Sequence, residues 1–205
     1  MALNVIDHPL ARHLLTLLRD KATPPSHFRV LCQQVTTLIA IEATRTLAER
    51  PVDIVTPMEP FEGSQLAEPL AVVPILRAGL GMVQPIVDLF PSASVGYIGL
   101  ERDHDTAIAR SYYCKLPRVD DKHVLLVDPM LATGGSAVRA IDIVMERKPR
   151  RISLLCIVSA PEGVKAVLDK YPELPVFTAA LDRQLNERKY ILPGLGDFGD
   201  RLYGT

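Results

Sequence analysis

Three short, continuous apolar segments constrain the fold of this sequence more than any other feature. They are LAVVPIL at 70–76, VLLV at 124–127 and ISLLCIV at 152–158. The segments that follow them have helical spacing and cover residues 79–90, 136–147 and 161–171. Strands that are apolar on both faces must be covered on both sides, as they are in a parallel sheet flanked by helices. We therefore expect an α/β fold with a central parallel sheet.

Two helices are expected before this alternating pattern. Asp7 can cap the first, with Pro9 in its first turn, and Ser26 can cap the second. The second has an apolar face formed by Phe28, Leu31, Cys32, Val35, Leu38 and Ile39. Such faces pack against a core or against a second subunit, and periodicity alone does not choose between these.

Composition limits the classes of protein that this chain can belong to. Its 205 residues, 48% of them hydrophobic, fit one domain over residues 1–205. A net charge of -1 gives no general reason to expect nucleic-acid binding, and no apolar run reaches the roughly 20 residues that cross a membrane. Three widely spaced cysteines are typical of reduced thiols in a cytoplasmic protein, and the five histidines lack metal-ligand spacing. No protein-held metal site is therefore expected.

The segment 124–149 contains the strongest candidate for a ligand site. It is interpreted as a buried strand, a turn, and a helix with Val138, Ile141 and Met145 directed inward. Paired glycines at the helix start let the backbone approach a phosphate, toward which the helix N-terminus directs free N–H groups. Asp128, at the strand end, would repel phosphate but suits a ribose hydroxyl. A glycine-rich turn capped by Ser136 is the plainer alternative.

The sequence DPMLATGGS at 128–136 resembles the ribose-phosphate motif of type I phosphoribosyltransferases, in which two acidic residues precede TGG[TS]. Pro129 replaces the second acid, as in the uracil branch of that family, so Asp128 is the single acidic contact. The resemblance implies that the whole loop binds 5-phosphoribosyl 1-diphosphate (PRPP). The residues concerned are Asp128, Pro129, Met130, Leu131, Ala132, Thr133, Gly134, Gly135 and Ser136.

The C-terminal segment, residues 189–205, is rich in glycine and formally spells GxGxxG. With six residues left after Gly199, no βαβ unit can follow, so a dinucleotide-dependent oxidoreductase is disfavoured. A flexible tail is one interpretation. The other is a rigid loop whose backbone N–H and C=O groups match the carbonyls and N–H of uracil and leave cytosine unpaired.

This segment is similar to the uracil-binding signature of the uracil phosphoribosyltransferases. The resemblance implies that Ile191 and the backbone of Gly196, Asp197 and Phe198 hold the base, and that Asp197 also approaches PRPP. Many members carry alanine where this chain has Phe198, a change that a backbone contact tolerates.

Two arginines complete the expected donor site. Arg77, in PILRAGLGM, follows a predicted strand, where its guanidinium and the glycine-turn amides can bind diphosphate. Taken alone, an arginine at such a position is more often a surface charge. The resemblance identifies it as a substrate contact and adds Arg102, which begins a polar segment, 102–117, expected to be a projecting loop or β-arm.

The resemblance, which covers nearly the whole chain, implies a type I phosphoribosyltransferase fold with N-terminal helices and a projecting β-arm. The implied reaction is uracil plus PRPP giving UMP and diphosphate, with substrate-bound Mg²⁺ as cofactor and no side chain assigned as general base. It also implies a homo-oligomer, and GTP is a candidate effector because some relatives respond to it. Two alternatives remain: an enzyme for a purine or orotate, and a regulator with this fold that binds RNA or a partner protein.

Overall fold

A nine-stranded, mostly parallel sheet forms the centre of the protein. The computed structural model describes residues 2–102 and 109–205. Seven strands lie in the order β1 (Leu3–Val5), β11 (Val176–Leu181), β10 (Arg151–Ser159), β8 (His123–Val127), β4 (Leu70–Leu76), β6 (Tyr97–Arg102) and β7 (Ala109–Lys115). Short β5 (Ser94–Val95) pairs with β4, and β9 (Met130–Leu131) pairs with β10. Only β7 is antiparallel to its neighbour among the paired strands described in this sheet.

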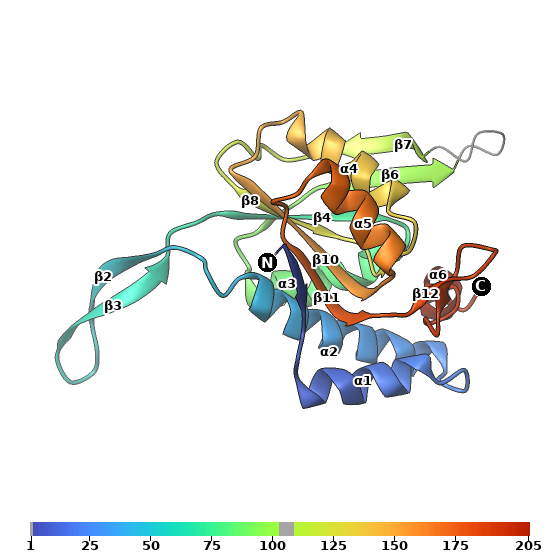
Figure 1. Cartoon of the computed structure of the whole chain (residues 1–205). Coiled ribbons are helices and arrows are strands. Elements are labelled where there is room, and N and C mark those ends of the chain that lie inside the picture. The colour runs from blue at the N-terminus through green and yellow to red at the C-terminus, as the bar shows by residue number, and fades with distance from the viewer. Residues whose placement is uncertain (1, 103–108) are drawn as a thin grey trace.

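Helices cover both faces of this sheet (Figure 1). One face carries α1 (Pro9–Arg19), α2 (Pro25–Ala43) and α3 (Val83–Leu89), and the other carries α4 (Gly135–Met145) and α5 (Pro161–Lys170). In β8, Leu125 and Val127 pack on the first side, while Val124 and Leu126 pack on the second. The continuous apolar runs of the sequence therefore lie between two cores, which confirms the predicted α/β fold class.

The ends of three helices differ from the sequence predictions. The side chain of His8, not Asp7, caps α1 by accepting a hydrogen bond from Leu10 N at 3.1 Å. Pro24 occupies the N-cap of α2, so Ser26 lies inside the helix. Met145 is 48% exposed because it is the last residue of α4, where the helix has passed the edge of the core.

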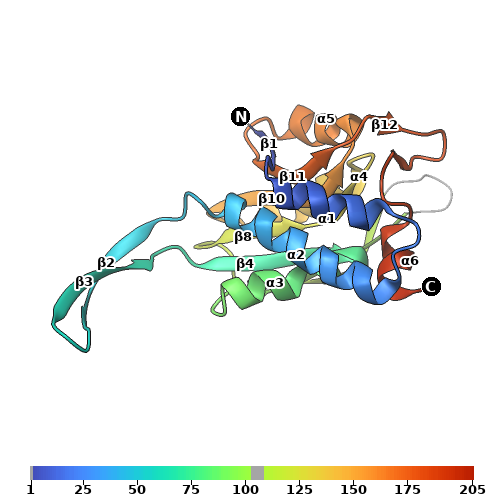
Figure 2. The ribbon, with the colours of Figure 1, turned by 90° about the horizontal axis from the view of Figure 1, so that it is seen from below.

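A hairpin of β2 (Glu49–Val55) and β3 (Pro60–Leu66) projects from the body of the molecule (Figure 2). The projecting arm was expected at 102–117 instead. In that segment, residues 109–115 form β7, which pairs with β6 at the sheet edge, and residues 103–108 lie outside the described residues. The arm is therefore built by a segment that sequence patterning did not single out.

The chain ends in small elements beside the sheet. They are β12 (Gln184–Leu185), β13 (Ile191–Leu192) and α6 (Phe198–Tyr203). Elsewhere in the chain, a 3-10 helix, η1 (Ala78–Met82), links β4 to α3. Figures 1 and 2 both place α6 at the end of the molecule opposite the β2–β3 hairpin. Within residues 2–102 and 109–205, no helix is long and apolar enough to cross a membrane.

Candidate active site

The predicted ligand loops meet at one edge of the sheet. Strands β4, β6 and β8 are parallel neighbours, so the loops after them leave from the same edge. Pro74 of β4 lies beside Val127 of β8, which brings the loop that begins at Arg77 next to the loop that begins at Asp128. Open α/β sheets bind ligands beyond the carboxyl ends of their strands, as this arrangement would.

The turn before α4 has the geometry of an anion cradle. Gly134 is the N-cap residue and has a φ of 82°, in the left-handed region. The first helical hydrogen bond runs from Val138 N to Gly134 O at 2.8 Å, so the preceding N–H groups lie outside the helical ladder. Ser136 is inside the helix, which removes the alternative in which it caps the turn. The helix start can therefore direct several N–H groups at a phosphate.

Helix α5 holds this turn from behind. A Cβ on Gly134 would lie 2.8 Å from Gly163 O, and one on Gly163 would lie 2.5 Å from Ala132 O. Backbone therefore packs directly on backbone at both positions. Sequence reasoning missed Gly163, because a glycine inside a predicted helix carries no signal of what packs against it.

Asp128 lies at the end of β8, half-buried. Its backbone N–H donates to Leu155 O at 3.1 Å. Burial raises the pKa of its carboxyl group to about 7, and a hydrogen bond from the backbone of Met130 offsets part of that rise. Near neutral pH the group therefore changes easily between a carboxylate that accepts hydrogen bonds and a protonated acid that donates one.

The loop after β4 is packed against the end of β8. Arg77 is exposed at the start of η1, and its peptide bond with Leu76 is cis. A Cβ on Gly79 would lie 2.6 Å from Val127 O, so only glycine allows this close approach. The packing keeps the Arg77 loop next to Asp128. Arg102 ends β6 at the same edge, and its side chain lies outside the described part of the chain.

The C-terminal loop is ordered and closes the same edge. Gly194 and Gly196 have φ values of 61° and 75°. Asp197 caps α6, its carboxylate accepting from Asp200 N at 3.0 Å. Ile191 and Phe198 are buried, at 4% and 3% exposure, which leaves their backbone as the part able to meet a ligand. This loop is a built structure and not a flexible tail.

The ring of Phe198 faces the core. It meets Phe28 of α2 edge-to-face, with ring centroids 5.1 Å apart and planes at 65°. The Phe198 side chain therefore fills space beneath the loop and does not line its open side.

Comparison with known proteins identifies the family. The model of the uracil phosphoribosyltransferase family matches residues 5–205. The chain belongs to this family. A uracil phosphoribosyltransferase of Symbiobacterium thermophilum is 52% identical over 98% of this chain and 97% of its own length. One from Thermosipho africanus is 48% identical over the whole of both chains. The solved structure of AQ2163 protein from Aquifex aeolicus is 32% identical, with a TM-score of 0.94, over 99% of this chain and 98% of its own.

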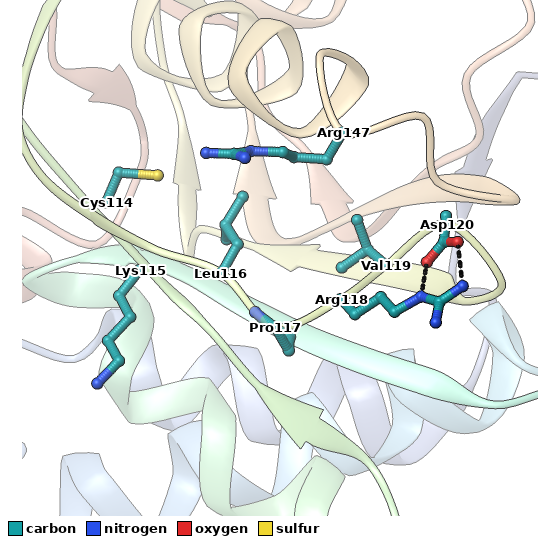
Figure 3. Close-up of a pocket in the computed structure, with 8 residues that line it drawn as sticks. All are labelled: Cys114, Lys115, Leu116, Pro117, Arg118, Val119, Asp120 and Arg147. Atoms are coloured by element: carbon teal, nitrogen blue, oxygen red, sulfur yellow. Dashed lines mark hydrogen bonds and ion pairs between the residues drawn. The ribbon is translucent and has the colours of Figure 1, made fainter.

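A large surface pocket of this protein lies away from the candidate active site. It has a volume of about 680 Å³ and is lined by residues 114–120 and Arg147, which precede β8 and follow α4 (Figure 3). Arg118 is paired there with Asp120, with Nε 2.7 Å from the carboxylate. This pocket is therefore at the amino end of β8, whereas the candidate active site is at the carboxyl ends of the strands.

Proposed function

We propose that this member of the uracil phosphoribosyltransferase family transfers the 5-phosphoribosyl group of PRPP to N1 of uracil, forming UMP and diphosphate. The observation that carries the proposal is the phosphate cradle at Gly134 facing the same sheet edge as the glycine-rich loop at 194–198. One feature suits the sugar phosphate and the other suits a planar base.

The donor site would be assembled from three loops. N–H groups of residues 133–136 would bind the 5-phosphate with the help of the α4 dipole. Asp128 would accept hydrogen bonds from ribose hydroxyls, as the single acidic contact, because Pro129 stands where the second acid of the motif would be. Arg77 and the amides of η1, together with Arg102, would bind the diphosphate. Residues 130–132 would contribute main-chain atoms that connect Asp128 to the cradle.

The base site would use main-chain groups of Ile191, Gly196, Asp197 and Phe198. A fixed backbone offers donors and acceptors in one arrangement only, and this arrangement rejects a base that leaves buried groups unpaired. Because the side chain of Asp197 caps α6 and its C=O accepts from Arg201 N at 3.1 Å, its N–H is the group we assign to the base. Its exposed carboxylate edge would face PRPP.

The chemistry requires positioning and charge stabilisation. The N1–C1 bond forms as the bond from C1 to the diphosphate oxygen breaks, and the N1 proton leaves to solvent. Positive charge develops on the ribose ring in such displacements. The residues of this chain would hold N1 in line with C1 and stabilise the departing diphosphate. No side chain is assigned as a general base.

Mg²⁺ would be held mainly by the oxygens of the diphosphate. Among the described residues, no group of three or more His, Cys, Asp or Glu side chains is arranged to hold a metal. Asp128 offers carboxylate oxygens at the loop, the ligand type that Mg²⁺ prefers. When bound, the ion supplies charge neutralisation of the diphosphate.

The assay for this proposal is UMP formation from uracil and PRPP with Mg²⁺, beside parallel reactions with cytosine, hypoxanthine and orotate. Turnover with uracil far above that with each of the other bases is the expected result. Turnover on another base would support the proposed PRPP site and contradict the assignment of uracil to the C-terminal loop. A folded protein that binds PRPP without turnover on any base would favour a regulator, for which salt-dependent RNA binding is the next measurement.

Assembly, effector and location are part of the same proposal. We infer a homo-oligomer that contacts through the β2–β3 hairpin, which exposes Val55, Met58 and Phe61 at 81%, 90% and 56%. A single domain over residues 1–205 would be the subunit. Cys32, Cys114 and Cys156 are free thiols, which suits a cytoplasmic enzyme. The assay run with and without GTP tests whether GTP is an effector.

A further inference from the structure

A buried ion pair connects the first helix to the C-terminal loop. Arg19, the last residue of α1, forms a fork with Asp182, which follows β11. Nη2 of Arg19 lies 2.6 Å from Oδ1 of Asp182, and Nη1 lies 2.9 Å from Oδ2. The Asp182 side chain is 5% exposed and that of Arg19 is 25% exposed. Two parallel charged hydrogen bonds fix the relative orientation of both groups.

The same two side chains hold Gly194 from both sides of its backbone. Nη1 of Arg19 donates to Gly194 O at 2.8 Å, and Gly194 N donates to Oδ2 of Asp182 at 2.8 Å. Gly194 therefore has its carbonyl and its N–H fixed by a single ion pair. The direction of the chain as it enters the turn at 194–196 is set by residues from two other parts of the sequence.

The backbone at Gly194 has a conformation that only glycine can adopt at this point of the loop. Its φ is 61°, and a Cβ there would lie 2.1 Å from Ile191 O. Ile191 and Gly196, on either side, are residues that we assign to the base. A change in the orientation of Gly194 would therefore move groups that contact uracil.

A second arginine holds the next residue. Arg201 of α6 donates to Leu195 O at 2.9 Å and to Leu18 O at 2.5 Å, and its guanidinium lies 4.4 Å from the centroid of the Phe28 ring. The carbonyls of Gly194 and Leu195 are thus both fixed, and both are tied to the end of α1. Of the two arginines, only Arg19 is itself held by a carboxylate that also binds the loop.

We propose that Arg19 and Asp182 are positioning residues that set the base specificity of the enzyme by fixing the backbone of Gly194. This inference rests on the proposed base site at Ile191 and residues 196–198. Neither side chain is assigned a contact with substrate. They act by fixing the directions of the main-chain hydrogen-bond donors and acceptors in the loop at 191–198.

The structure provides a matched control on the same helix. Arg12 forms an ion pair with Asp7, with Nη1 2.5 Å from Oδ1. Unlike the Arg19–Asp182 pair, this pair is exposed: the side chain of Arg12 is 63% exposed and that of Asp7 is 92% exposed. Exposed pairs contribute little to stability, whereas breaking a buried pair leaves a charge without its partner. Asp7→Asn and Arg12→Lys therefore repeat the chemical changes away from the loop.

The experiment compares Asp182→Asn and Arg19→Lys with these controls. It measures KM for uracil, the Kd of PRPP by calorimetry in the absence of base, and the ratio of kcat/KM for uracil to that for cytosine. We expect the KM for uracil to rise by at least about tenfold, because a small displacement of positioning groups has large effects. The uracil-to-cytosine ratio should fall, while the Kd of PRPP stays within about twofold and the controls match the wild type.

Circular dichroism and thermal melting establish that each variant is folded. Arg19→Lys keeps the positive charge and most of the packing of the side chain, so it can test the proposal if Asp182→Asn does not fold. Equal changes in uracil KM and PRPP Kd, or an unchanged base ratio in a folded variant, would overturn the positioning role. Failure of the wild-type protein to use uracil would instead overturn the proposed base site.

Discussion

The hydroxyl of Tyr203 donates a hydrogen bond to the main-chain carbonyl of Arg77 at 3.2 Å. This contact joins α6, which follows the base loop, to the start of η1, where the diphosphate is expected to bind. Leu202 packs beside it, since a Cβ on Gly81 would lie 2.9 Å from Cδ2 of Leu202. The loop assigned to the base and the loop that begins at Arg77 therefore share one supporting contact.

Tyr203→Phe should weaken donor binding more than base binding. The substitution removes one partly exposed hydrogen bond, whose contribution is on the order of 1 kcal/mol, so we expect the KM for PRPP to rise about fivefold. Initial-rate kinetics with each substrate varied in turn would measure this. A larger effect on uracil than on PRPP would show that Tyr203 supports the base loop and not the Arg77 loop.

Gly134→Ala should destabilise the protein, whereas Gly135→Ala should leave its stability unchanged and affect only the binding of PRPP. At Gly134 the left-handed φ and the 2.8 Å contacts should lower the melting temperature, since this conformation costs an L-residue about 1–2 kcal/mol before any clash. At Gly135 the nearest atom to a new Cβ is Thr133 Oγ1 at 3.9 Å, so stability should be unchanged. A loss of PRPP binding in Gly135→Ala alone would then report a phosphate that lies against the backbone there.

Asp128 should make PRPP affinity depend on pH around neutrality. Its pKa is raised to about 7 by burial, so below that pH the free enzyme carries a protonated acid, and above it a carboxylate that can accept two ribose hydroxyls. Affinity should therefore increase as pH rises through 7. Calorimetric titration from pH 6 to 8 would measure the trend, and Asp128→Asn should flatten it. An unchanged slope in that variant would assign the pH dependence to the phosphate groups of the ligand.

The same carboxyl group should affect folding with the opposite sign. The folded state keeps its proton up to about pH 7, whereas the unfolded chain loses it near the ordinary value of 3.8. The unfolded state therefore binds fewer protons between these limits, and the unfolding free energy should fall as pH rises across them. Denaturant melts of the free protein and of Asp128→Asn would show this decline in the first and its absence in the second.

Phe198→Ala should cost stability without changing the choice of base. The ring is 3% exposed and packs on Phe28, so its removal should lower the unfolding free energy by on the order of 3 kcal/mol. The uracil-to-cytosine ratio should stay within about twofold, because the ring faces away from the open side of the loop. Phe198→Leu, which fills most of the same volume, should recover most of the melting temperature. A changed base ratio in Phe198→Leu would show that the ring shapes the base site after all.

Charges on the β2–β3 hairpin should disrupt assembly. Val55→Glu with Phe61→Glu places two carboxylates on an arm whose apolar side chains are exposed, so the oligomer should dissociate. Light scattering after gel filtration would measure the mass. Met145→Glu, at an exposed apolar residue of α4, is the control and should leave the mass unchanged. A monomeric wild-type protein would contradict the oligomer proposal.

Features that depend on local burial were predictable from sequence. The runs 70–76, 124–127 and 152–158 became β4, β8 and β10 because a strand buried on both faces must be apolar at every position. The β2–β3 hairpin was missed for the same reason, since it stands away from any core and has no pattern to detect. Asp7 and Ser26 were wrong as caps because a cap depends on the dihedral angles of one residue, which its type does not fix.

Contacts between distant parts of the chain were not predictable in this way. The turn that we assign to phosphate could be singled out in the sequence because Gly134 and Asp128 lie in one short segment. The contacts of Arg19 span 163 residues to Asp182 and 175 to Gly194, and no local spacing connects them. Only the folded chain shows that an ordinary helix-ending arginine supports the loop assigned to the base.

The anchoring of the C-terminal loop on α1 sets an order for folding during synthesis. A ribosome makes α1 before residues 182–201, so Arg19 is synthesised 163 residues ahead of Asp182, the carboxylate that it binds in the finished protein. The phosphate cradle is built on β8, α4 and α5, all of which precede these residues in the chain. A nascent chain should therefore acquire its capacity to bind a sugar phosphate before its capacity to select a base, because the proposed base loop is held in place only after α6 has been made.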